Sequence, residues 1–439
     1  MIDEQRQKWY HTYIQTMKEG NDADMPHILK QDSWEAQFSE DGSTRSVKKI
    51  LITSDLYRPS VNGVVTSVVN LITELRKRGY EVRILTTSYD NNYHRDDDDQ
   101  VYYMRSVPFK VYPGIRMPLN FFKHEYLDEI IRWRPDVVHS QCEFFTFQYA
   151  LKIVEETGAA FVHTYHTLYN QYATYLPLHA GADLMIAVAS QLRLEVVDTV
   201  IAPTQKVRET LLDYGVRADI AVIPTGISLD KFRVPIDEEM IASLRKTYGL
   251  TPQTRVLLSL GRLGKEKNIE ELIRYFSTLS RFRDDVRLMI VGGGPDAERL
   301  QEIAESYLLG DRVIFTGMID PSLVRQYYAL ADIFVCASTS ETQGLTYVEA
   351  LSCGLPLVCR NDAALDGVIS NGIGGYRYEN CGEFCNYVAR ILDTPPLQQS
   401  MRQENAANAE KFSKERFAEN IARLYEQQYR KKSPAAPQL

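Results

Sequence analysis

From residue 48 onwards, short apolar runs alternate with amphipathic stretches. The segment KKILITSD (48–55) is a near-continuous apolar run, which is typical of a strand covered on both faces, and EVRILTT (81–87) is the next strand. Between them, SVVNLITELRKRGY repeats apolar residues every three or four positions and reaches basic residues before Gly79, which predicts a helix with its C-cap. Further strand-like runs are DVVHS, AFVHTY, TVIAPT and IAVIPTG. This alternation predicts an α/β fold with a parallel, doubly wound sheet.

A turn-rich segment at residues 224–230 precedes a second alternation of the same kind. Strands are expected in TRVLLSLGR, VRLMIVGGG, VIFTG, DIFVCAS and LPLVCRN, and helices in NIEELIRYFSTL and DAERLQEIAESYL. We therefore expect two Rossmann-like domains facing a cleft, residues 48–226 and 227–412, with ligands beyond the carboxyl ends of the strands. A last amphipathic helix is expected at residues 413–430, before a disordered tail at 431–439.

The first 47 residues are polar and contain no strand-like run. Trp9, Tyr13 and Met17 form an apolar stripe at helical spacing. Two interpretations stay open, a helix docked on the body and an anchor at a membrane interface. Residues 20–47 are typical of a flexible connector.

Composition narrows the class of protein. The 439 residues are 44% apolar and 25% charged, which is typical of a soluble globular chain. The net charge of −8 excludes a global basic field for nucleic acid, and no apolar run is long enough for a transmembrane helix. The N-terminus lacks the apolar core of a secretory signal. Five of the six cysteines lie in the second half without metal-ligand spacing, so we expect a reducing, cytoplasmic compartment.

The segment ASTSETQGLTYVEALSCGLP carries the strongest chemical signal. A helix is expected to begin near Gly344, directly after a strand and a polar loop, so that backbone N–H groups such as those of Leu345 and Thr346 face an anion. Glu341 precedes this helix and Glu349 lies within it. A phosphate site beside two acids that accept hydrogen bonds from sugar hydroxyls points to a nucleotide sugar. An ordinary crossover with two solvated acids is the alternative.

Two glycine-containing turns follow neighbouring strands. In SLGRLGKEKN, Arg262 offers a two-pronged phosphate ligand and Lys267 a compact charge, the alternative being a basic surface turn. In VGGGPDAERL, Gly293 and its neighbours allow a ligand to approach the backbone closely. The spacing is not that of a dinucleotide fingerprint, so a tight turn without a ligand is equally open.

The first half offers two polar strand ends. SDLYRPSVNGVVTSV places Asn62 and Gly63 ahead of a helix, where N–H groups can reach a phosphate. HTYHT places His163 and His166 at a strand end, without a third ligand for a metal. The acidic run at residues 96–99 lies in a polar segment, and we expect a solvated loop there.

Together, these segments resemble glycosyltransferase family 4, the retaining transferases of the GT-B fold, over about residues 48–430. The most specific element is the E-x7-E pair of Glu341 and Glu349, with GR-x-x-x-EK (Arg262 and Lys267) after the opening strand of the second domain. Within the family, SETQGLTYVEALSCGLP, HTYHT and NGVVTSV resemble bacterial diacylglycerol glucosyltransferases.

The resemblance implies a role for each matched position. Arg262 and Lys267 hold the donor diphosphate and neutralise the leaving group, Glu341 contacts the donor sugar, and His166 lies at the reacting sugar and the acceptor hydroxyl. Further donor contacts are implied for Gly63, Gly293, Gly344, Leu345, Thr346 and Glu349, the last of which binds the ribose. Asn62 stands where the family has a first glycine, which weakens a phosphate contact there. The final helix is implied to pack back on the first domain.

The function expected from this resemblance is transfer of glucose from UDP-glucose to diacylglycerol, peripherally at the inner face of the plasma membrane. No metal cofactor and no protein nucleophile is expected. VPFKVYPGIRMPLNFFKHEY, with Lys110, Arg116 and Lys123, is a candidate contact with an anionic membrane surface, together with the basic residues 76–78; packing on the protein's own core is the alternative. Two other functions stay open. One is a transferase that acts on a soluble sugar, polysaccharide or protein acceptor, and the other is a non-catalytic subunit that binds a sugar nucleotide.

Overall fold

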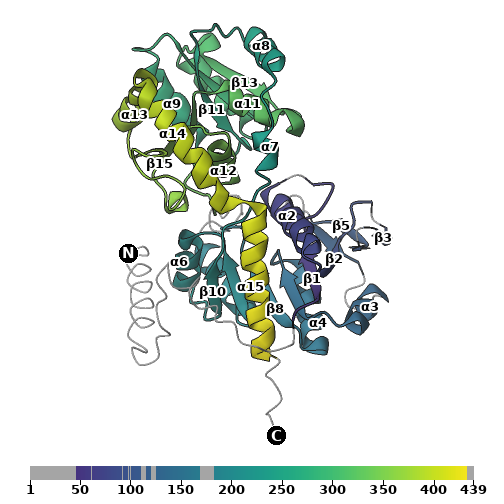
Figure 1. Cartoon of the computed structure of the whole chain (residues 1–439). Helices are drawn as coiled ribbons and strands as arrows, with labels where there is room; N and C mark the ends of the chain where they lie inside the picture. Colours follow the sequence, from purple (N-terminus) through teal and green to yellow (C-terminus); the bar gives the residue numbers. More distant parts are fainter. Residues whose placement is uncertain are drawn as a thin grey trace, which may run out of the picture. The chain divides into compact units, whose positions relative to one another are not determined.

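The computed structural model describes residues 46–60, 62–90, 92–96, 98, 100–109, 115–119, 125–168 and 182–432. The expectations for residues 1–45 and for most of the tail lie outside the described residues. Two large, mostly parallel sheets, each flanked by helices, make up most of the described chain (Figure 1). The predicted α/β class is therefore confirmed.

The first sheet is built from the first half of the chain. Among the described residues it has eight strands in the order β10-β9-β8-β7-β1-β2-β4-β3, all parallel except that β3 is antiparallel to β4. Its strands are β1 (Lys49–Ser54), β2 (Glu81–Thr87), β3 (His94–Asp96), β4 (Val101–Met104), β7 (Val137–Ser140), β8 (Ala160–Thr164), β9 (Thr199–Ala202) and β10 (Asp219–Val222). The strands β5 (Ser106–Pro108) and β6 (Arg116–Pro118) form a separate antiparallel pair. The helices of the first half are α2 (Gly63–Lys77), α3 (Glu125–Trp133), α4 (Phe145–Thr157), α5 (Ala182–Leu194) and α6 (Gln205–Asp213).

The second sheet repeats the arrangement. Over the described residues it has six parallel strands in the order β13-β12-β11-β14-β15-β16. They are β11 (Arg255–Leu260), β12 (Val286–Val291), β13 (Val313–Gly317), β14 (Ile333–Cys336), β15 (Leu357–Arg360) and β16 (Gly375–Tyr378). The helices of this half are α7 (Asp230–Arg233), α8 (Glu238–Thr247), α9 (Ile269–Leu279), α10 (Ala297–Ser306), α11 (Val324–Leu330), α12 (Leu345–Ser352), α13 (Cys381–Asp393) and α14 (Pro395–Asn408).

Successive strand residues contribute to opposite faces of each sheet, which explains the apolar runs. In β1, Leu51 packs in one core cluster while Ile50 and Ile52 pack in another. In β11, Leu257 and Leu258 divide in the same way between two clusters. A strand buried on both faces needs apolar residues at every position, and this is the pattern seen in the sequence.

The last helix, α15 (Lys414–Lys432), packs on the first half of the chain. It lies beside α2 and β8 (Figure 1). The Tyr425 hydroxyl is 2.6 Å from Nδ1 of His139 in β7, and the backbone N–H of Val47 donates to Glu426 at 2.9 Å. The chain therefore returns to the first sheet after completing the second.

One sequence expectation about a loop is wrong. Asp96, assigned to a solvated acidic loop, ends the short strand β3, which pairs with β4. Asp98 is exposed, and the other two acidic residues of the run lie outside the described residues. The short strands β4 and β16 had no counterpart among the predicted elements.

Candidate functional site

Three turns of the second half meet at one edge of its sheet. β11 lies between β12 and β14, and all three strands are parallel, so their carboxyl ends share an edge. The turn after β11 carries Arg262, the turn after β12 carries Gly293, and the loop after β14 carries Glu341. The fold thus brings together three motifs that are far apart in the sequence, at the edge where α/β sheets bind ligands.

Lys267 and Glu341 form the central ion pair of this edge. Lys267 ends the 3-10 turn η3 (Lys265–Lys267), and its Nζ donates to Oε1 of Glu341 at 2.6 Å. Burial opposes ionisation of Glu341, but the charge of Lys267 and a hydrogen bond from Ser338 hold its pKa below the usual value. Glu341 is therefore an ionised acceptor held beside an ammonium group.

Arg262 is paired with one acidic residue and is otherwise largely exposed. One guanidinium nitrogen lies 3.4 Å from Oε1 of Glu266, whose side chain is almost fully buried, while the Arg262 side chain is 53% exposed. An exposed guanidinium at the end of a strand suits a phosphate group, which it can bind with two parallel hydrogen bonds.

The helix α12 begins where the sequence predicted it. Its N-cap, Gly344, has a φ of +73°, and a Cβ there would overlap the ring of Tyr347, so glycine is needed at this position. Leu345 and Thr346 open the helix, where backbone N–H groups have no partner within the helix. A Cβ on Gly63, the first residue of α2, would lie 3.5 Å from Cδ1 of Leu345. The first loop of the first half therefore reaches the start of α12.

Glu349 lies one turn further along α12. The buried Tyr328 hydroxyl donates to its Oε2 at 2.8 Å. Burial raises the pKa of Glu349 to about 7, although the Tyr328 bond and the charge of Lys231 act in the other direction. Glu349 therefore changes charge near neutral pH, whereas Glu341 does not.

The glycine turn after β12 is bonded to the Arg262 turn. The N–H of Leu263 donates to the Gly293 carbonyl at 2.9 Å, and the N–H of Asp296 donates to the Leu263 carbonyl at 3.0 Å. A Cβ on Gly293 would lie 2.9 Å from the Met318 side chain. The two turns thus form one unit.

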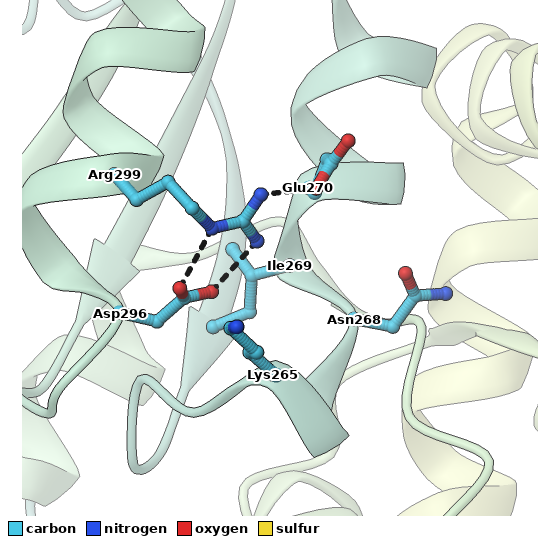
Figure 2. Close-up of a pocket in the computed structure, with 6 residues that line it drawn as sticks. All are labelled: Lys265, Asn268, Ile269, Glu270, Asp296 and Arg299. Atoms are coloured by element: carbon cyan, nitrogen blue, oxygen red, sulfur yellow. Dashed lines mark hydrogen bonds and ion pairs between the residues drawn. The ribbon is translucent and has the colours of Figure 1, made fainter. Parts of the chain in front are cut away.

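A cavity of about 350 Å³ lies beside these residues. It is lined by Lys265, Asn268, Ile269, Glu270, Asp296 and Arg299. Figure 2 shows the Arg299 guanidinium between the carboxylates of Asp296 and Glu270, at 2.7 and 2.6 Å. Arg299 therefore ties the starts of α9 and α10 together, and none of the predicted site residues lines this cavity.

The two histidines of HTYHT have different surroundings. His163 is fully buried in β8, with its ring nitrogens 3.2 Å from the Ser140 hydroxyl and 3.3 Å from the Glu143 carboxylate. His166 lies beyond the strand, is partly exposed, and has Nε2 2.8 Å from Oε1 of Gln141. Desolvation by its neighbours lowers the pKa of His166 to about 4, so its ring is neutral at pH 7. Of the two, only His166 has a surface exposed to solvent.

The structure also shows polar residues that the sequence did not single out. Thr204 and Lys206, at the start of α6, contact the loop that carries Glu341, and Gln343 in that loop bonds to the backbone of Thr225. Asp55, at the end of β1, is fully buried. No local motif marks these residues, because their partners lie 90 or more positions away.

The basic residues assigned to a membrane surface are largely engaged within the protein. The Arg116 guanidinium donates to the hydroxyl and the carbonyl of Ser106, both at 2.9 Å. Arg76 donates to the Val82 carbonyl and Arg78 to the Glu415 carbonyl. Lys110 and Lys123 lie outside the described residues. The packing alternative thus holds for Arg116.

Within the described ranges, no helix is both long and apolar enough to cross a membrane. The same ranges contain no group of three or more His, Cys, Asp or Glu side chains that could hold a metal ion.

Comparisons with known proteins identify both halves. A family model described as Glycosyltransferase Family 4 matches residues 61–231, and one described as Glycosyl transferases group 1 matches residues 241–411. A Streptococcus pneumoniae protein named alpha-monoglucosyldiacylglycerol synthase is 35% identical over 86% of this chain and 85% of its own length. A protein of the same name from Acholeplasma laidlawii is 28% identical over 86% of this chain and 96% of its own.

Solved structures share the fold at lower identity. A sucrose-phosphate synthase from Thermosynechococcus elongatus superposes with a TM-score of 0.68 at 22% identity, over 87% of this chain and 98% of that chain. Anabaena HepE in complex with UDP-glucose gives a TM-score of 0.66 at 17% identity, over 86% and 98% of the two chains. Likeness at this level shows the arrangement of two Rossmann-like halves.

Proposed function

We propose that this chain, which belongs to glycosyltransferase family 4 and has the GT-B fold, transfers glucose from UDP-glucose to diacylglycerol. That it is a hexosyltransferase follows from the family models and from the 35% identical relative. The observation that carries the proposal for the donor is the Lys267–Glu341 pair beside Arg262, at the edge where α12 begins.

The charges at this edge fit a nucleoside diphosphate sugar. When the bond to the sugar breaks, negative charge grows on the diphosphate, and pre-placed cations and N–H groups stabilise it. Arg262 and Lys267 supply the cations, and the start of α12 supplies the N–H groups. With these groups in place, the proposed reaction needs no metal ion. A solved relative in fold, HepE, holds UDP-glucose.

The carboxylates fit the hydroxyl-rich parts of such a donor. Glu341, ionised and hydrogen-bonded to Lys267, accepts from the transferred sugar, and Glu349 accepts from the ribose. The acceptor hydroxyl attacks from the face that the diphosphate leaves, so that the configuration at the sugar carbon is retained. The departing phosphate takes the acceptor proton, and neutral His166 orients the groups at the reacting carbon.

A lipid acceptor is supported by the relatives and by the surface of α5. Both curated relatives are named for synthesis of monoglucosyldiacylglycerol. In α5 and just beyond it, Met185, Val188, Leu192 and Val196 are 68%, 40%, 63% and 47% exposed, a stripe at helical spacing. Exposed apolar patches of this kind mark contacts with proteins or membranes. We assign this α5 stripe to the lipid surface from which the acceptor enters, at the inner face of the plasma membrane.

The test is a transfer assay with UDP-glucose, run with anionic vesicles that contain or lack diacylglycerol. UDP release and extracted lipid are measured together. We expect UDP release that depends on diacylglycerol, with a glucosylated lipid as product. The matched control is Arg262→Ala, which removes an exposed side chain and is expected to abolish turnover while the melting temperature is unchanged.

Each other outcome contradicts a defined part of the proposal. UDP release that does not depend on lipid would indicate a soluble sugar, polysaccharide or protein as the acceptor. Transfer from a different nucleotide sugar would contradict the proposed donor and leave the proposed acceptor unchanged. Absence of release with any nucleotide sugar, although the sugar nucleotide binds, favours a non-catalytic subunit. Activity in Arg262→Ala equal to that of the unaltered protein removes the phosphate role of Arg262.

A further inference from the structure

The loop that carries Glu341 is bonded to other segments at every position. We call residues 339–343 the donor loop. Its bonds run from Lys206 Nζ to the Thr339 carbonyl (2.8 Å), from Ser340 Oγ to the Glu266 carbonyl (2.9 Å), from Lys267 Nζ to Glu341 (2.6 Å), from Thr204 Oγ1 to the Thr342 carbonyl (2.6 Å), and between the Gln343 side chain and the N–H and carbonyl of Thr225 (2.7 and 2.9 Å). Three of these partners, Thr204, Lys206 and Thr225, belong to the first half.

Thr204 has two tasks at the start of α6. As the N-cap residue, its hydroxyl accepts from the N–H of Val207 at 3.4 Å. The same hydroxyl donates to the Thr342 carbonyl. One side chain thus joins the end of a helix in the first half to the residue after Glu341.

Lys206 adds a largely buried ion pair. Its Nζ lies 2.8 and 2.7 Å from the two carboxylate oxygens of Asp362, and the two side chains are only 16% and 11% exposed. Asp362 also accepts from the N–H of Ala364. Removing one member of a buried pair leaves the other charge without compensation, so such a pair holds its geometry more firmly than an exposed one.

Helix α6 is attached to the sheet that carries His166. It follows β9, which pairs with β8, and His166 lies just beyond β8. The contacts of Thr204 and Lys206 therefore join the donor loop to the part of the first half that carries His166. We propose that Thr204 and Lys206 are positioning residues, which hold the donor loop so that Glu341 stays aligned with His166 across the reacting sugar. The inference rests on the proposed function for the roles of Glu341 and His166.

Displacement of Glu341 should affect turnover more than nucleotide binding. A misplacement of about 1 Å in a reacting group costs roughly a hundredfold in rate. UDP lacks the sugar that Glu341 is proposed to contact, so its binding should not respond. If Lys206 had only a structural role, its replacement would lower the stability of the protein and weaken the binding of all ligands together.

The experiment compares Lys206→Met with Lys431→Met. The first keeps the length of the side chain and removes its charge, and the second breaks the exposed Lys431–Asp219 pair, 3.0 Å long, away from the donor loop. For Lys206→Met we expect kcat with UDP-glucose to fall by about ten- to a hundredfold, an unchanged Kd for UDP, and faster hydrogen–deuterium exchange in residues 339–343. Lys431→Met should change none of these, and Lys206→Arg should restore most of kcat.

The outcomes separate this inference from the proposed function. Hydrogen–deuterium exchange and UDP binding can be measured without an acceptor. If the wild-type protein fails to glucosylate lipid, the proposed acceptor is wrong, but the comparison of exchange rates still tests the positioning role. Unchanged exchange in the donor loop, or losses of stability and UDP affinity that parallel the loss of kcat, would overturn the positioning role. If Lys206→Met does not fold, Thr204→Val against Thr204→Ser makes the same test through the hydroxyl.

Discussion

The two halves of the chain share a fold but differ in the charged groups at the carboxyl ends of their strands. At the strand ends of the second half, Lys267, Glu341 and Arg262 are charged and paired, and each keeps some exposure to solvent. In the first half, His166 is held neutral and Asp55 is fully buried, with a pKa raised to about 6. Because both sheets are doubly wound, this difference comes from the loops and not from the architecture.

The contrast follows from what each half is proposed to meet. A leaving diphosphate gains negative charge during the reaction, so fixed cations near it lower the barrier. An acceptor hydroxyl on a lipid is neutral, and its delivery requires an apolar surface, such as the α5 stripe. In the proposed reaction, one Rossmann-like scaffold thus serves a charged ligand in one copy and a neutral, apolar ligand in the other.

After the loss of turnover expected for Arg262→Ala, the largest effect should come from removing the central cation of the second half. Lys267→Met removes the charge that is proposed to face the diphosphate and leaves Glu341 without its 2.6 Å donor. We expect kcat with UDP-glucose to fall by about a hundred- to a thousandfold. Lys265→Met is the matched control, because Lys265 belongs to the same turn but lines the neighbouring cavity (Figure 2). Steady-state kinetics checks the result, and equal losses in the two variants would contradict the assignment.

A smaller effect should distinguish the apolar surfaces of the two halves. The double variant Met185→Glu/Leu192→Glu places charges in the α5 stripe at its two most exposed side chains, which are 68% and 63% exposed. Burying such a side chain in lipid contributes about 1.5–3 kcal/mol, so we expect vesicle binding and lipid-dependent transfer to fall at least about tenfold. The measurements are vesicle sedimentation and the transfer assay, with UDP affinity unchanged.

The control for this prediction lies in the second half. Phe282 and Leu308 are 82% and 92% exposed but are not assigned to the lipid. Phe282→Glu/Leu308→Glu should leave vesicle binding unaltered. If it weakens binding as much as the α5 variant does, the lipid surface is not confined to the first half.

The fold and the donor side could be predicted because their signals are local. Strands buried on both faces appear as apolar runs, and Gly344 marks the start of α12 within a single motif. The short strand β4 was missed because it has only four residues and directly follows a polar segment, although it lies between β2 and the edge strand β3. Predicted roles of Glu341, Arg262, Lys267 and His166 remain predictions that the kinetics above address.

The acceptor side and the cross-chain contacts gave no local signal. Lys206 and Asp362 are 156 positions apart, and neither stands in a motif. In α5 almost every residue is apolar or small, so the pattern does not distinguish the face packed on the sheet from the exposed face. Basic residues such as Arg116 are equally ambiguous, because a cation looks the same in the sequence whether it faces lipid or bonds to Ser106.

The buried acid of the second half should make donor binding depend on pH. Burial raises the pKa of Glu349 to about 7, so it is mostly ionised at pH 8 and mostly protonated at pH 6. The ionised form accepts hydrogen bonds from ribose hydroxyls better, so the Kd of UDP-glucose should rise by up to about tenfold from pH 8 to pH 6. Glu349→Gln should flatten this dependence in calorimetry. Glu341→Gln should retain it, because the pKa of Glu341 lies below its usual value.

The smallest effect on turnover is expected at Asp55, the buried acid of the first half. Its carboxylate accepts from the N–H groups of Phe145 and Thr146 and from the Thr146 hydroxyl, at 3.0–3.1 Å, so it fixes the start of α4. Asp55→Asn keeps an acceptor there, and we expect kcat at pH 8 to change less than about twofold. Measuring donor turnover in this variant separates a structural acid from the ligand-facing Glu349.

Stability, by contrast, should reveal the raised pKa of Asp55. Between the unfolded value of 3.8 and the folded value of about 6, the folded protein holds a proton that the unfolded chain has lost, so this carboxyl stabilises the fold more as the pH falls. Asp55→Asn has no carboxyl at this position, so its stability does not gain this contribution as the pH falls. The free energy of unfolding of the wild type, minus that of Asp55→Asn, should therefore increase by about 1–3 kcal/mol between pH 7.5 and 4.5. The subtraction removes the opposite contributions of His139 and His166, whose lowered pKa values destabilise the fold in acid. A difference independent of pH in urea unfolding would mean that Asp55 ionises normally, and the contrast between the two halves would then rest on His166 and the α5 stripe alone.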